Sequence, residues 1–345
     1  MRCEFIFPLS YFYHSDSTLF TCPVFGGNYN TRLPDIEREL KHYKAHFKGK
    51  VVLSNCDDPW VSNFFVYFSQ NFQKLGLKKL ITTCYKNSQP DMFSEHKSEK
   101  AVWLEYTGDK DGDRVPSPEE IGIKHLKGDG DFRSEECIEL LKQAHIVVTN
   151  PPFSLFREYV TQLVKYDKKF LVVGTWNAIT YKEIFKLIKE NKLWIGINSN
   201  RNFSGFIVPE HYPLRGTEAR IDENGNRIVS SNNTCWFTNL DIAKRHEDLV
   251  LYKTYNPTEY PTYDNYDAIE VSKTNDIPID YAGVMGVPVT FLHKFNPEQF
   301  EILGTSDRGG DDLPEIDAIR LTEKKMDSCL VNGKKVYKRL FIRRK

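Results

Sequence analysis

The residue pattern that most clearly suggests chemistry is Asn150-Pro151-Pro152-Phe153, which directly follows the β-branched run at 146–149. Consecutive prolines carry carbonyls but no N–H groups and keep the backbone extended, so a carbonyl can point outward without a competing local donor. The Asn150 side chain adds a second acceptor, and the Phe153 ring offers a face for stacking. This combination suits an amino group on a planar system, although the same residues also occur at ordinary strand exits.

Acceptors for both amine hydrogens would draw the nitrogen out of conjugation with its ring. Its lone pair could then attack an electrophilic methyl group directly, and no covalent enzyme intermediate would be needed. If the amine belongs to adenine in duplex DNA, the nucleotide must rotate out of the stack, and Phe153 would replace part of the lost stacking.

Two other loops carry polar residues at places where ligands commonly bind. Asp57 and Asp58 follow a short strand-like run at 51–53 and could hold the ammonium end of a cofactor, or cap the helix that starts near Pro59, as Ser62 could. In the loop at 128–132, glycines permit close backbone approach and an acid can accept from an adenine amine. Taken alone, that loop is more often only a turn.

The elements around these loops alternate between strands and helices. Apolar patterns predict strands at 51–53, 80–85, 146–149 and 170–173, and helices at 35–47, 64–75, 137–144, 155–164 and 184–188. This alternation predicts an α/β fold with a mainly parallel, doubly wound sheet, which binds ligands beyond the carboxyl ends of its strands.

The alternation fades after about residue 195, where short strand-like pieces surround a turn signal at 222–226. The composition changes near residue 255, where tyrosine, proline and asparagine become frequent. We therefore predict a catalytic domain over residues 1–255 and a C-terminal region over residues 256–345.

Composition narrows the class of protein. The chain has 47 basic and 47 acidic residues, so a nucleic-acid partner would have to be held by a local basic patch. Seven scattered cysteines without a CxxC pair indicate reduced thiols, and neither a secretory signal nor a membrane span is evident. His42 and His46 have a possible metal-ligand spacing but no evident third ligand, so we predict no metal site.

The Asn-Pro-Pro-Phe motif and several further stretches give the chain a resemblance to the EcoRI-like family of adenine-specific DNA methyltransferases. The resemblance runs from about Tyr29 onward, and its supporting stretches are residues 55–59, 62–65, 75–81, 128–132, 263–269, 286–292 and 295–302. It implies a Rossmann-like sheet with a C-terminal DNA-recognition region. It further implies S-adenosylmethionine as the donor, adenine N6 in double-stranded DNA as the acceptor, a bacterial or phage-encoded cytoplasmic enzyme, and possibly a separate cognate restriction endonuclease.

The resemblance also implies roles for individual residues. The target amine would lie at Asn150, Pro151, Pro152 and Phe153. The residues implied at the donor are Asn55, Asp57 and Asp58 around its methionine part, Asp129, Asp131 and Phe132 near its adenine, and Tyr29 and Thr31 closing over it. Pro59, Ser62 and Asn63 are also implied to bind the donor. Two features of methyltransferases at large are missing: no Phe-x-Gly-x-Gly loop follows the first strand, and residues 82–85 end the second strand without an acid. How the donor ribose is held therefore stays open.

Target recognition is expected in the C-terminal region, because the pocket motif reads only the flipped base. Seven of the last twelve residues are basic, and the candidates for DNA contact are Lys338, Arg339, Arg201, Arg215, Arg220 and Arg227. A solvated terminal strand is an equally good interpretation of the basic tail. Two other functions remain open: methylation of RNA or of a protein glutamine, and a catalytically silent DNA-binding module.

Overall fold

The computed structural model describes residues 30–56, 62–83, 101–110, 112, 116–117, 120–199, 203–208, 219–223, 225–229, 233–306, 313–322 and 328–345. The chain divides into two compact units. The first contains Met1–Thr175 and Asn198–Leu240, and the second contains Trp176–Ile197 and Asp241–Lys345. The predicted division into a catalytic domain over residues 1–255 and a C-terminal region over residues 256–345 is a functional one, and it stays a prediction.

The first unit follows the alternation that the apolar patterns predict. Its elements are β1 (Asn30–Thr31), α1 (Leu33–Leu40), α2 (Lys44–Phe47), β2 (Val51–Asn55), α3 (Asn63–Gln70), α4 (Phe72–Leu75), β3 (Lys79–Thr83), β4 (Val102–Tyr106), β5 (Ile121–His125), α5 (Glu135–Gln143), β6 (Ile146–Thr149), η2 (Phe153–Leu155), α6 (Phe156–Lys165), β7 (Lys169–Thr175), β9 (Phe206–Ile207), β10 (Ala219–Ile221), β11 (Arg227–Val229) and β12 (Thr234–Thr238). The helix expected over 35–47 is two helices, so His42 and His46 do not share one helical face.

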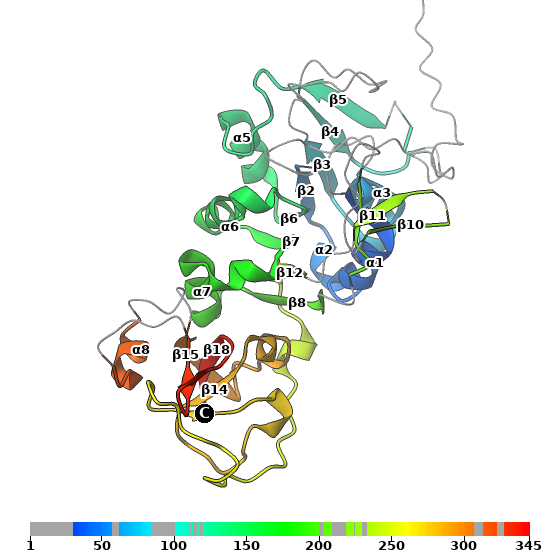
Figure 1. Cartoon of the computed structure of the whole chain (residues 1–345). Coiled ribbons are helices and arrows are strands. Elements are labelled where there is room, and N and C mark those ends of the chain that lie inside the picture. Colours follow the sequence, from blue (N-terminus) through cyan, green and yellow to red (C-terminus); the bar gives the residue numbers. More distant parts are fainter. Residues whose placement is uncertain are drawn as a thin grey trace, which may run out of the picture. The chain divides into compact units, whose positions relative to one another are not determined.

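The main sheet has eight strands in the order β5-β4-β3-β2-β6-β7-β12-β8, with β8 at Trp194–Ser199. Strands β3, β2, β6 and β7 are parallel to one another, whereas β4, β5 and β12 pair antiparallel. The fold is therefore α/β with a mixed sheet rather than a mainly parallel one. Helices α5 and α6 cover one face of the sheet, and α1 and α3 lie on the other (Figure 1).

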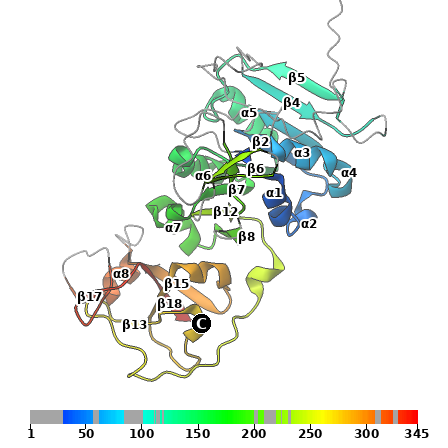
Figure 2. The same cartoon turned by 45° about the vertical axis from the view of Figure 1, so that its right-hand side comes forward.

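The antiparallel strands β4 and β5 extend the sheet beyond β3 (Figure 2). In β4, the buried Val102, Leu104 and Tyr106 alternate with the half-buried Trp103 and Glu105. This alternation is typical of an antiparallel strand near a sheet edge, where one face is more exposed than the other.

A small second sheet in the first unit has the strand order β1-β9-β11-β10. Strands β10 and β11 form the antiparallel hairpin expected around the turn at 222–226. The turn is closed by a hydrogen bond of 2.9 Å from the Asp222 N–H to the Asn226 carbonyl, and Gly225 has a φ of +81°, which glycine adopts easily. Strand β9 links this hairpin to β1.

The second unit contains η3 (Trp176–Thr180), α7 (Lys182–Lys189), η5 (Ala243–His246), β13 (Ile269–Glu270), η6 (Thr274–Asp276), β14 (Met285–Pro288), η7 (Val289–Lys294), β15 (Phe300–Thr305), α8 (Pro314–Ile319), β16 (Leu330–Val331), β17 (Lys334–Lys335) and β18 (Arg339–Arg344). Strands β13, β14, β18 and β15 form its sheet in that order. Helix α7 belongs here because it contacts β15, and Lys189 forms an ion pair of 2.7 Å with Glu315 of α8.

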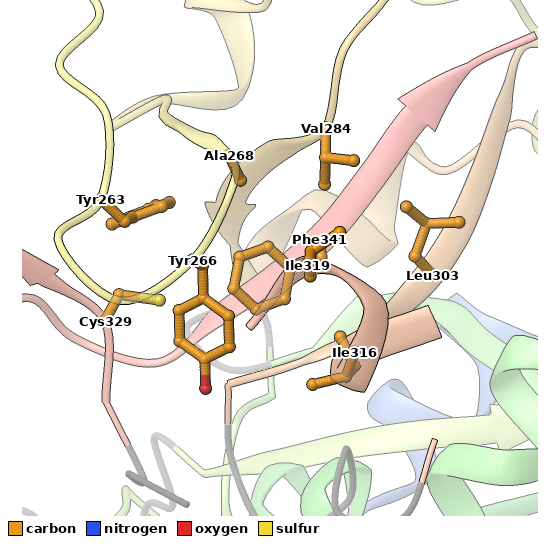
Figure 3. Packing of buried hydrophobic residues seen from close by; sticks show 9 residues of the cluster. All are labelled: Tyr263, Tyr266, Ala268, Val284, Leu303, Ile316, Ile319, Cys329 and Phe341. Atoms are coloured by element: carbon orange, nitrogen blue, oxygen red, sulfur yellow. The ribbon is translucent and has the colours of Figure 1, made fainter. Parts of the chain in front are cut away.

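The core of the second unit lies between its sheet and α8 (Figure 3). The aromatic rings of Tyr263 and Tyr266 contact Phe341 of β18, and Ile316 and Ile319 of α8 belong to the same cluster. This apolar cluster gives the unit a core of its own. None of the helices in the described ranges has the length and apolar character that a membrane crossing requires.

Candidate active site

The Asn-Pro-Pro-Phe segment leaves the sheet directly at the end of β6, as predicted. Asn150 is half-buried, Pro151 is buried, and Pro152 is extended, with φ −57° and ψ 123°. The Pro152 carbonyl accepts a hydrogen bond of 3.0 Å from the Leu155 N–H as η2 begins. Among the described residues, no group donates to the Pro151 carbonyl. This carbonyl therefore remains available as an acceptor beside the Asn150 side chain.

The Phe153 ring is supported from the small sheet. Its centroid lies 6.3 Å from that of Phe206 on β9 in an edge-to-face arrangement at 74°. Phe206 in turn contacts Phe203 at 5.2 Å, and Phe203 contacts Trp236 of β12 at 6.2 Å. Sequence reasoning did not identify Phe206, because β9 is only two residues long. This row of rings limits the orientations that Phe153 can adopt.

The end of β2 is tied to β6 and α6 by buried hydrogen bonds. The Thr149 hydroxyl donates to the Asn55 carbonyl, and the Tyr159 hydroxyl donates to Asn55 Oδ1. Cys56 follows with a φ of +80°, so the chain turns sharply where the strand ends. Asn55 is thus fixed in position at the carboxyl edge of the sheet. Asp57, Asp58 and Pro59, the other residues expected here, lie outside the described residues.

Ser62 caps helix α3. Its Oγ accepts hydrogen bonds from the N–H groups of Phe64 at 3.2 Å and Phe65 at 3.3 Å, which is the capping role that the sequence left open for it. The next residue, Asn63, donates through Nδ2 to the Thr31 carbonyl at 2.8 Å. This bond ties β1 to the start of α3. Tyr29, the neighbouring residue expected at the donor, lies outside the described residues.

The loop at 128–132 contacts helix α6 through Phe132. The buried Phe132 ring contacts Tyr159 edge-to-face, with centroids 5.1 Å apart, and its carbonyl accepts a hydrogen bond of 2.9 Å from Gln162 Nε2. Tyr159 therefore joins Asn55 to Phe132. Sequence reasoning assigned Tyr159 only to the apolar stripe of its helix, because its hydroxyl partner comes from a distant strand.

The two acids of this loop are engaged locally. Asp129 is exposed and accepts a hydrogen bond of 3.0 Å from the Asp131 N–H. Asp131 forms an ion pair of 2.6 Å with Arg133, and the Arg133 side chain is the main reason that the pKa of Asp131 is lowered. Asp131 thus remains a charged acceptor at the edge of the Phe132 loop.

These residues fit S-adenosylmethionine, the donor that the resemblance implies. Asn55 offers polar groups at the strand ends, and Phe132 offers an aromatic ring on the other side of Tyr159. Thr31 is buried, yet its Oγ1 has no hydrogen-bond partner among the described residues. A polar ligand at the β1 edge would satisfy this hydroxyl. The described residues contain no cluster of three or more acidic, histidine or cysteine side chains that could hold a metal.

The basic candidates have different surroundings. Arg220 is exposed on β10, and its Nη2 donates to the Ser204 carbonyl at 2.6 Å, while Arg227 on β11 is half-buried. Lys338 is half-buried before β18. The remaining two, Arg201 and Arg215, lie outside the described residues.

Arg339 differs from the other basic candidates because its side chain points inward. It is only 8% exposed, and its Nη2 lies 2.6 Å from Glu270 Oε1. The Arg339 Nε also donates to Glu270 Oε2 at 3.0 Å, and the Tyr263 hydroxyl donates to the same carboxylate. The guanidinium is therefore held in an internal ion pair of the second unit.

Comparison with known proteins identifies the family of this chain. A family model described as the adenine-specific methyltransferase EcoRI matches residues 26–345. The type II methyltransferase M.EcoRI of Escherichia coli is 55% identical over 317 residues, covering 91% of this chain and 92% of that relative. The type II methyltransferase M.MgeORF184P of Mycoplasma genitalium is 39% identical over 325 residues (91% and 94%), and M.MpnI of Mycoplasma pneumoniae is 40% identical over 277 residues (79% and 80%). No solved structure matches this chain significantly. The chain therefore belongs to the EcoRI family of adenine-specific methyltransferases.

Proposed function

We propose that this protein transfers a methyl group from S-adenosylmethionine to N6 of a flipped-out adenine within a specific site in double-stranded DNA. The observation that carries this proposal is the pair of acceptors at the end of β6, the Asn150 side chain and the unpaired Pro151 carbonyl, next to the supported Phe153 ring. The family and its type II relatives support DNA as the substrate and a restriction-modification setting.

In this proposal the chain binds and orients the target base. Asn150 Oδ1 and the Pro151 carbonyl accept the two hydrogens of the adenine amine, which leaves the nitrogen lone pair directed at the donor. Phe153 stacks on the flipped base, and the edge-to-face contact with Phe206 limits the orientation of the Phe153 ring. The donor, when bound, supplies the electrophilic methyl group. Methyl transfer would release S-adenosylhomocysteine, and the amine proton would then leave the positively charged nitrogen for solvent, so a general base is not required before attack.

The donor would lie along the carboxyl edge of β2 in a doubly wound, Rossmann-like arrangement. We assign Asn55 to its methionine part and Phe132 to its adenine, and Asn63 to the donor site as well; the contacts that hold these three side chains in position support the assignment. The other residues proposed at the donor are Tyr29, Thr31, Asp57, Asp58, Pro59, Ser62, Asp129 and Asp131. Water would be excluded because Asn55 and Phe132 are themselves buried.

Target recognition is proposed for the C-terminal region and for the basic residues of the first unit. Lys338, Arg220 and Arg227 are candidates on described elements, and Arg201 and Arg215 are candidates outside them. Arg339 is not included, because its guanidinium is bound to Glu270. A cognate restriction endonuclease would act as a separate protein on the same site. Because the substrate is genomic DNA, we place the enzyme in the bacterial cytoplasm.

The proposal is tested by incubating the purified protein with labelled S-adenosylmethionine and unmethylated genomic DNA, and digesting the product to nucleosides. We expect N6-methyladenine at every copy of one short motif when modified positions are mapped by sequencing. Label in RNA or protein but not in DNA would assign the site to another planar amine. Protein that binds no donor would be a silent DNA-binding module.

A further inference from the structure

Strand β3 ends in a buried hydroxyl group that has no hydrogen-bond partner within the described part of the chain. Thr83, its last residue, is 1% exposed, and nothing described there donates to or accepts from its Oγ1. Buried hydroxyls in folded proteins almost always have a partner, because an unpaired one has lost its water without compensation. A ligand that brings a polar group to the end of β3 would provide that partner.

The register of the sheet places this hydroxyl beside the candidate active site. Thr83 pairs directly with Asn55, the last residue of the parallel strand β2. Directly paired residues project from the same face of a sheet. The Asn55 side chain accepts from Tyr159 of α6, and the Tyr159 ring contacts Phe132. Thr83 therefore projects from the α6 face, one strand away from Asn55.

We propose that the Thr83 hydroxyl binds a ribose hydroxyl of S-adenosylmethionine. This inference rests on the proposed function, in which Asn55 is assigned to the methionine part of the donor and Phe132 to its adenine. The ribose connects those two parts. Adjacent strands are about 4.8 Å apart, so a ligand group next to Asn55 can reach the neighbouring strand end.

A threonine hydroxyl suits this role because it can both donate to and accept from a ribose O–H group. Residues 82–85 contain no acidic side chain that could accept from the ribose instead. The Thr83 hydroxyl, buried and unpaired among the described residues, can supply both a donor and an acceptor at this strand end.

Thr82 provides a matched control. It is also fully buried, and its Oγ1 is likewise unpaired among the described residues. It projects from the opposite face, because it pairs with Leu104 and shares that face with Tyr106, whose ring contacts Phe65 of α3 at 6.4 Å. Removing the Thr82 hydroxyl therefore makes the same chemical change in the same strand, away from the α6 face.

The test measures binding of S-adenosylhomocysteine and of its 2′-deoxy and 3′-deoxy ribose analogues by titration calorimetry. The proteins are the wild type, Thr83→Val, Thr83→Ser and Thr82→Val. We expect Thr83→Val to weaken S-adenosylhomocysteine about tenfold, which corresponds to about 1.4 kcal/mol. The deoxy analogue that lacks the hydroxyl bound by Thr83 should bind Thr83→Val as well as it binds the wild type, because this analogue cannot make the contact with either protein. Thr83→Ser and Thr82→Val should bind like the wild type.

The ribose assignment is overturned if Thr83→Val binds S-adenosylhomocysteine as tightly as Thr82→Val does. It is also overturned if Thr83→Val weakens all three ligands equally, because the loss would then not depend on a ribose hydroxyl. Should Thr83→Val not fold, the wild type still tests the assignment. If it binds both deoxy analogues as tightly as S-adenosylhomocysteine, neither ribose hydroxyl makes a contact, and the assignment is contradicted. A wild-type protein that binds none of the ligands would contradict the proposed function and this inference together.

Discussion

Replacing Tyr159 by phenylalanine should weaken donor binding without removing any residue that we place at the donor. The Tyr159 hydroxyl donates to Asn55 Oδ1, and the two side chains are 1% and 5% exposed. Phenylalanine keeps the ring that packs on Phe132 but leaves the Asn55 oxygen buried without this donor. An unsatisfied buried acceptor costs about 1–3 kcal/mol, so we expect unfolding in urea to require about that much less free energy.

Tyr159→Phe should also weaken donor binding, because the Asn55 side chain is no longer held in one orientation. A loss of about 1.4 kcal/mol corresponds to roughly tenfold weaker binding of S-adenosylhomocysteine, measured by titration calorimetry. Tyr166→Phe is the control, since Tyr166 lies at the end of the same helix and is only half-buried. If Tyr159→Phe matches Tyr166→Phe in both stability and affinity, the reasoning about Asn55 is refuted.

Two further predictions concern the second unit. Arg339→Met should lower the free energy of unfolding by about 3–5 kcal/mol, because it leaves the Glu270 carboxylate buried without its partner. The control in urea unfolding is Arg343→Met, since Arg343 is exposed. Equal stability of the two variants would contradict the internal ion pair. Burial lowers the pKa of His293 to about 4 from 6.5. The unfolded chain therefore takes up this proton at a higher pH than the folded one does. The contribution of His293 to the free energy of unfolding should be constant above about pH 6.5. It should lower that free energy by about 3 kcal/mol as the pH falls to 4. Urea unfolding across this range should show a shallower decline for His293→Asn, and parallel profiles would contradict the assignment.

Much of the first unit could be predicted from the sequence, because its elements have simple apolar patterns. The runs at 51–53, 146–149 and 170–173 each lie within a parallel strand of the sheet. The position of the Asn-Pro-Pro-Phe segment followed from the strand before it. In these segments the local apolar pattern and the tertiary environment agree, so the pattern alone was sufficient to predict the strand.

The parts that could not be predicted depend on contacts between distant residues. Tyr159 has the spacing of an ordinary core residue, and only the fold shows that its hydroxyl binds Asn55. Arg339 belongs to a basic tail in the sequence, yet it faces inward because Glu270 lies 69 residues away along the chain and beside it in space. The alternation of buried and half-buried residues in β4 is the signal from which this antiparallel strand could be predicted.

In the proposed function, Asn150 orients the target amine and does not hold the donor. The most direct test of this role measures, in one Asn150→Ala preparation, both the affinity for S-adenosylhomocysteine and the rate of N6-methyladenine formation under saturating DNA. We predict affinity within about twofold of the wild type and a rate lower by about 100-fold or more, comparable to the loss of one preorganised polar contact to the reacting group. Methylation at the wild-type rate, or a loss of donor affinity that accounts for the whole decrease, would contradict the account.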